Sequence, residues 1–184
     1  MRNGIRRIGM WLAALSLVSI TNIVQVSAQE VTTQNTELED KVRKNPTAIN
    51  YTNLSLAYQK SKQYDKAQKA AETAISLNPK YGGGYICLAQ SFEKRGNREK
   101  AAEIYEKANA KLSNYDPLIF FTSMNLGILG QTNFKERNYQ RSLKYFEDSL
   151  EYAEKGSSKL DKNEQFQLHK ERLPKWISKV KARL

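Results

Sequence analysis

The fold is decided by residues 51–79, which read YTNLSLAYQKSKQYDKAQKAAETAISLNP. In its first half, Tyr51, Leu54 and Tyr58 recur at the spacing of one buried helix face. After a turn around residues 62–65, three alanines recur at helical spacing, and Pro79 ends the pattern: Ala67, Ala71 and Ala74. Because alanine lets two helix axes approach closely, the segment predicts a pair of antiparallel helices packed against each other.

The same pattern returns 34 residues later, with matching residue types at matching positions: Tyr85, Leu88, Phe92, Ala101, Tyr105 and Ala108. In this period and pattern the chain resembles the tetratricopeptide repeat (TPR) family. The resemblance implies an all-α solenoid, a right-handed superhelix of antiparallel helix pairs. One such unit cannot bury its apolar face alone, so copies must stack.

A third, degenerate copy carries Leu129-Gly130 and then four residues at the expected spacing: Tyr139, Ser142, Phe146 and Ser149. It lies 41 residues beyond the second copy, so seven extra residues enter around 116–122 and predict a longer first helix that begins after Pro117. The register of this helix stays open by one residue, because Asn133 occupies a place typical of an aromatic side chain and Phe134 follows it.

Residues 1–28 are expected to be a secretory signal peptide. Arg2, Arg6 and Arg7 precede an apolar run over 8–20, and Val26-Ser27-Ala28 fits a cleavage site after Ala28. The alternative is an uncleaved signal anchor. Cleavage would leave an exported protein of the periplasm or cell envelope whose net charge falls from +11 to +8.

The predicted organisation behind that segment has five parts. A leader with a short capping helix, opened by the capping-box pair Thr36 and Glu39, covers 29–47. TPR 1, TPR 2, a degenerate TPR 3 and a basic C-terminal capping helix follow over 48–81, 82–115, 116–156 and 157–184. Between the first two repeats, residues 82–84 are all glycine and are interpreted as a frayed loop, with a hinge or a close approach to a ligand as the alternative.

The C-terminal segment carries an apolar stripe that would cover the exposed end of the solenoid, and Pro174 is expected to kink or split its helix: Phe166, Leu173, Ile177, Val180 and Leu184. The same segment is basic. It could therefore also act as an amphipathic helix that binds anionic lipid or cell-wall polymer.

The residues give no support to catalysis. Cys87 is expected to be a buried hydrophobe, since His169, the lone histidine, is remote in sequence and has no evident carboxylate partner. The sequence has no phosphate loop, nucleophile elbow or metal-ligand cluster. We therefore expect no enzymatic activity, no cofactor and no metal. An exported protein would not meet cytosolic nucleic acid, so nucleic acid is also excluded as a partner.

The resemblance implies that a partner peptide or helix binds the concave face. The family's chaperone-tail clamp is absent, because the matching positions hold Thr52, Leu56, Cys87, Met124 and Ile128. The groove is expected to comprise Ile49, Thr52, Leu56, Gln59, Lys60, Ile86, Gln90, Glu93, Lys94, Gln131, Phe134 and Lys135.

This groove would suit a peptide with apolar anchors and some acidic residues. Its three lysines, however, could simply be solvated helix residues. The expected function is a non-catalytic adaptor or assembly factor for an unidentified protein or peptide. The alternative is a surface-associating protein that uses its basic tail, and homo-oligomerisation stays open.

Overall fold

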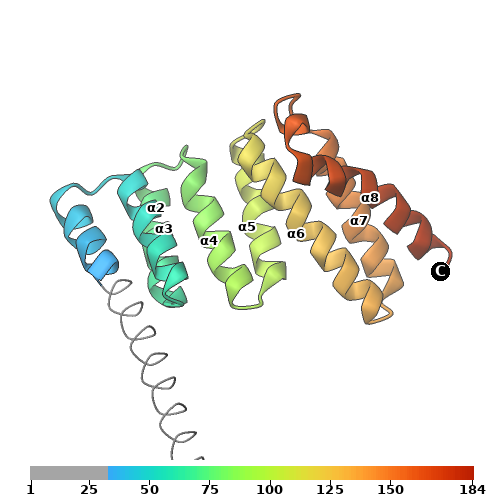
Figure 1. The fold of residues 1–184 in the computed structure, drawn as a ribbon, viewed down its shortest axis with the longest axis horizontal. Helices are drawn as coiled ribbons and strands as arrows, with labels where there is room; N and C mark the ends of the chain where they lie inside the picture. Colours follow the sequence, from blue (N-terminus) through green and yellow to red (C-terminus); the bar gives the residue numbers. More distant parts are fainter. Residues whose placement is uncertain (1–32) are drawn as a thin grey trace, which may run out of the picture.

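The computed structural model describes residues 33–184, and the expected signal peptide lies outside them. The described part contains helices and no strand, in a single row of pairs that runs in chain order (Figure 1). This arrangement confirms the predicted all-α solenoid. Residues 33–44 are helical and are followed by α2 (Ala48–Lys60), α3 (Tyr64–Leu77), α4 (Gly82–Lys94), α5 (Arg98–Lys111), α6 (Asp116–Lys135), α7 (Tyr139–Glu154), the short 3-10 helix η1 (Leu160–Lys162) and α8 (Glu164–Lys181).

The first helix of each pair ends in the same turn. One residue adopts positive φ in each case: Lys62 (59°), Gly96 (84°) and Arg137 (63°). The next backbone N–H then donates to a carbonyl five residues back, from Gln63 to Tyr58 (2.8 Å), Asn97 to Phe92 (2.9 Å) and Asn138 to Asn133 (2.8 Å).

These turns settle the register that the sequence left open in the third pair. Asn133, not Phe134, occupies the position of Tyr58 and Phe92. Its side chain is buried, and its amide donates to the carbonyl of Leu129 at 2.9 Å. A polar residue is tolerated there because its donor is satisfied inside its own helix.

Small residues line the crossing of the two helices in every pair. The facing residues are Ser55 and Ala67, Ala89 and Ala101, and Gly130 and Ser142, and all six are buried. In the first pair the Ser55 hydroxyl donates to the carbonyl of Ala67, and in the third the Ser142 hydroxyl donates to the carbonyl of Gly130, both at 2.8 Å. The two pairs therefore have the same close approach, although the serine lies on the first helix in one pair and on the second helix in the other.

The extra residues of the third repeat lengthen α6 at its start, to 20 residues against 13 in α2 and α4. The helix begins at Asp116, so the predicted start after Pro117 is wrong, and Pro117 lies in the first turn, where its missing N–H costs nothing. The added turns carry two aromatic contacts. The Phe121 ring stacks on Tyr105 of α5 (6.2 Å between centroids), and Phe120 meets Phe166 of α8 (5.8 Å).

Two other local predictions are corrected. Residues 33–35 are already helical, so Thr36 does not start the first described helix. The glycines at 82–84 are neither a loop nor a hinge, because they form the first turn of α4. A Cβ on Gly84 would lie 2.9 Å from Cγ1 of Ile75, so this glycine allows α4 to approach α3.

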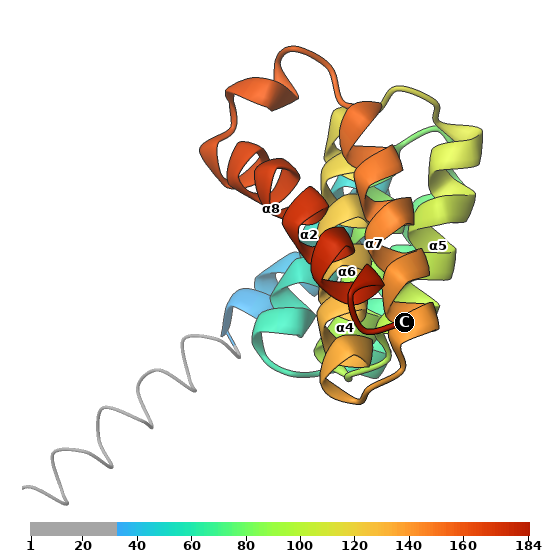
Figure 2. The ribbon, with the colours of Figure 1, turned by 90° about the vertical axis from the view of Figure 1, so that its right-hand side faces the viewer.

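The C-terminal helix α8 crosses the end of the row obliquely (Figure 2). Phe166, Leu173 and Val180 are at most 1% exposed, while Trp176 stacks on Phe146 of α7 at 5.3 Å. The predicted capping helix is therefore confirmed, but Leu184 is 62% exposed and does not join its stripe. Pro174 does not split the helix, which continues through it to Lys181.

This packing bears on the membrane alternative. An in-plane membrane helix would have to expose the apolar side chains that α8 buries against α6 and α7. Within residues 33–184, no helix has the length and the apolar character needed to cross a bilayer.

The Gly130→Ala substitution tests the tight crossing in the third repeat. A Cβ there would lie 2.8 Å from the Phe146 ring, and overpacking of this kind costs about 1–3 kcal/mol, more than the helix propensity gained. We expect a net loss in the free energy of unfolding, measured by urea denaturation. Gly83→Ala is the control, since its Cβ meets only the tip of the half-buried Tyr81 ring. Equal effects of the two substitutions would contradict this account.

Candidate functional site

The residues predicted to form the groove fall into two groups in the structure. The open group has exposed or half-buried side chains: Ile49, Leu56, Lys60, Ile86, Gln90, Lys94, Gln131 and Lys135. Ile49 is 58% exposed and Leu56 is 38% exposed. These side chains remain available to a ligand.

The other predicted groove residues are engaged between helices. Thr52 is buried: its hydroxyl donates to the carbonyl of Ala48 within α2, and its own carbonyl accepts from Sγ of Cys87 in α4 at 3.9 Å. Gln59 is also buried, and its Nε2 donates to the carbonyl of Cys87 (2.9 Å) and to Oγ of Ser91 (3.1 Å). Their expected exposure on the groove surface is therefore wrong: contact with the next helix covers them.

In each repeat, the same position of the first helix contacts the first helix of the following repeat. Gln59 of α2 reaches α4, and Glu93 of α4 accepts from Nδ2 of Asn125 in α6 at 2.7 Å. At the same position in α6, the Phe134 ring packs edge-on against Trp176 of α8 at 5.5 Å. By this contact, α8 occupies the place of the first helix of a fourth repeat.

The spacing within α8 agrees with that assignment. Counted from Glu164, the residues equivalent to Ile49, Thr52, Leu56, Gln59 and Lys60 are Gln165, Leu168, Arg172, Lys175 and Trp176. The face that would pair with a second helix is polar, unlike the Tyr51, Leu54, Ser55 and Tyr58 face of α2. It consists of Gln167, Lys170, Glu171 and Pro174. The fourth unit therefore stops after one helix and leaves no apolar pairing face uncovered.

A pocket of about 350 Å³ lies between α6 and α8. It is lined by Met124, Gly127, Ile128, Gln131, Phe146, Gln165, Leu168, His169, Arg172, Leu173 and Trp176. Gln131 is among the predicted groove residues, but sequence reasoning missed the contribution of α8. A signal was present, because Gln165, Leu168 and Arg172 follow i, i+3, i+7 spacing beside the capping stripe.

His169 fixes the wall of this pocket. Its Nε2 lies 2.9 Å from Oγ of Ser123 and 3.1 Å from Oγ of Ser149. The two serine hydroxyls donate to each other's backbone carbonyls (2.8 and 2.7 Å), so we assign the Nε2 proton as the donor to their oxygens. A Cβ on Gly127 would lie 2.5 Å from Cε1 of the imidazole, so glycine at this position makes room for the ring.

His169 and Cys87, the histidine and the cysteine of the sequence, both have shifted pKa values. Burial lowers the pKa of His169, and no carboxylate within residues 33–184 is hydrogen-bonded to its ring. Burial raises the pKa of the Cys87 thiol to about 12, which keeps the thiol protonated. Cys87 is 2% exposed, as expected for a buried hydrophobe.

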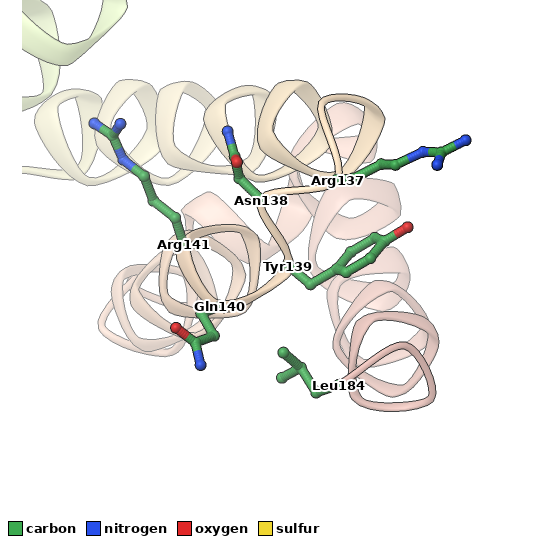
Figure 3. Close-up of a pocket in the computed structure, with 6 residues that line it drawn as sticks. All are labelled: Arg137, Asn138, Tyr139, Gln140, Arg141 and Leu184. Carbon is green, nitrogen blue, oxygen red and sulfur yellow. The ribbon is translucent and has the colours of Figure 1, made fainter.

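A second hollow, of about 530 Å³, lies at the turn between α6 and α7, beside Leu184 (Figure 3). Its two guanidinium groups, from Arg137 and Arg141, point in opposite directions, so they do not converge on an anion. Among residues 33–184, no three side chains of histidine, cysteine, aspartate or glutamate gather as a metal site would require.

Comparison with known proteins agrees with this geometry. Residues 48–81 match the tetratricopeptide repeat family. The chain is similar to the small glutamine-rich tetratricopeptide repeat-containing protein 2 of Saccharomyces cerevisiae, with 43% identity over 60 residues. The match covers 33% of this chain and only 17% of the yeast protein's length.

Two solved structures share the fold. A TPR repeats protein from Bacteroides fragilis is 12% identical, with a TM-score of 0.55 and coverage of 86% of this chain and 84% of its own. A tetratricopeptide repeat protein from Parabacteroides merdae is 17% identical, with a TM-score of 0.51 and coverage of 84% and 59%.

The His169→Gln variant tests the environment of the imidazole. Because the folded-state pKa lies below the unfolded value near 6.5, the unfolded chain takes up the proton first as the pH falls. Wild type should therefore lose stability relative to the variant between pH about 7.5 and 5.5, by at most about 1.4 kcal/mol per pH unit. Urea denaturation of both proteins across this range measures the difference. A difference that does not change with pH would show that the imidazole is not held in a desolvated site.

Proposed function

We propose that this chain, which belongs to the tetratricopeptide repeat family, is a non-catalytic interaction module that holds a partner polypeptide along α2, α4, α6 and α8. The observation that supports this proposal is the location of the exposed apolar side chains. Among residues 33–184, seven large hydrophobic residues are exposed, and four of them lie on these helices: Ile49, Leu56, Ile128 and Leu168. Exposed apolar side chains that recur along one surface mark an interaction site.

The chemistry of this surface favours an extended or helical peptide with apolar anchors. Polar side chains stand between the apolar ones, including Gln90 and Gln131, and can hydrogen-bond to a peptide backbone. Lys60, Lys94 and Lys135 are exposed at equivalent positions along one rim. We propose that they favour acidic residues in the partner.

We further propose that the module acts outside the cytoplasm, in the periplasm or cell envelope, as an adaptor or assembly factor. The support is the sequence of residues 1–28, with its arginines, apolar run and Val26-Ser27-Ala28 site.

A crosslinking experiment tests the groove. A photoreactive residue placed at Gln131, on the open groove surface, should crosslink the full chain to a discrete partner in native extract. The Leu56→Gln, Ile128→Gln and Leu168→Gln triple variant should lose at least about 90% of that product, because three apolar anchors are removed.

The matched control is Leu77→Gln. Leu77 is 48% exposed but is the last residue of α3, which is not one of the proposed groove helices. This variant should crosslink like wild type. Equal crosslinking by the folded triple variant would overturn the proposed function, and circular dichroism checks that each variant is folded.

A further inference from the structure

The pocket between α6 and α8 is lined by a positively charged side chain and by no negatively charged one. Its lining contains one permanent cation, Arg172, and no aspartate or glutamate. The Arg172 side chain is exposed, and within residues 33–184 no carboxylate lies within ion-pair distance of it. A guanidinium with this freedom can form a bidentate pair with a carboxylate from outside the chain.

The remaining surface of the pocket is largely apolar. Phe146, Leu173 and Trp176 belong to the packed core beneath it. Ile128 and Leu168 stand at its edge with 36% and 47% of their surface exposed. A volume of about 350 Å³ lies within the range of pockets that bind small ligands and accommodates one large side chain.

The imidazole offers a second polar contact. Since Nε2 is engaged by Ser123 and Ser149, Nδ1 is the ring nitrogen left without a hydrogen-bond partner in the described part of the chain. Nδ1 accepts a hydrogen bond when His169 is neutral, and it donates one when the ring is protonated.

We infer that this pocket takes a large apolar side chain that carries or adjoins a carboxylate, with Arg172 and His169 as the groups that meet the carboxylate. This inference rests on the proposed function, because it names the anchor that a bound partner would place at the α8 end of the groove. In this respect the pocket differs from the rest of the groove, where the positively charged residues are lysines on the outer rim.

Binding of a carboxylate here is coupled to the proton of His169. Its neighbours are Ser123 and Gly127 on α6, Ser149 on α7 and Arg172 on α8, so no acidic side chain stabilises the imidazolium in the free protein. A carboxylate supplied by the ligand would stabilise it. Affinity should therefore rise as the pH falls from about 7.5 to about 6, as long as the ligand carboxylate stays ionised.

Two small probes that differ only at the carboxylate test the inference. These are 3-phenylpropionate and 3-phenylpropanamide, each titrated into the full chain. His169 is the only histidine, so ¹³C labelling at histidine Cε1 gives one resonance, which reports directly on the pocket. At pH about 6 we expect both probes to shift this resonance, with the acid binding about three- to tenfold more tightly than the amide.

Two substitutions on α8 distinguish binding in the pocket from a general effect of positive charge. Arg172→Gln should lower the ratio of the acid's affinity to the amide's, so that only the share supplied by His169 remains. Lys175→Gln removes the same charge from a residue outside the pocket lining and should leave the ratio unchanged. Equal binding of acid and amide by wild type, or no shift with either probe, would overturn the inference. The crosslink at Gln131 could persist in both cases, so the proposed function stands or falls separately.

Discussion

The structure depends on one packing requirement: the buried face of each helix pair must pack against the next helix pair in the row. Helix pairs can close only where small residues meet, as at Ser55 and Ala67, and each pair must then be covered by the next. One position in the first helix of each pair contacts the first helix of the next repeat. It holds Gln59, Glu93 and Phe134 in succession, and the contact changes from hydrogen bond to aromatic packing as the row approaches its end.

The end of the row follows from the same requirement. α8 takes the place of a first helix, buries Phe166 and Leu173 against α6 and α7, and presents a polar face where a second helix would pair. The two added turns of α6 supply Phe120 for this docking. One helix therefore both closes the solenoid and extends the proposed groove, and the pocket beside His169 exists only because α8 is docked.

The fold was predictable because it rests on spacing. The 34-residue period, the small residues at the helix crossings and the seven-residue insertion are all visible in the sequence. The site was less predictable, because the exposure of a groove residue depends on the next helix. Gln59 and Thr52 occupy groove positions by pattern, yet contacts with α4 cover them. The contribution of α8 to the pocket was missed because its apolar stripe was interpreted as a cap or as a surface-binding face, while Leu168 and Arg172 lie on an adjacent stripe.

The central claim is that α8 is an integral part of the solenoid and forms one wall of the groove. Native-state hydrogen exchange on the full chain tests it most directly, because amides that open only with the whole domain share its unfolding free energy. The account predicts that amides around Leu173 in α8 exchange with the same free energy as those around Phe146 in α7, and that both decrease together in urea. Exchange of the α8 amides through a separate opening of lower free energy, with α7 still protected, would contradict it.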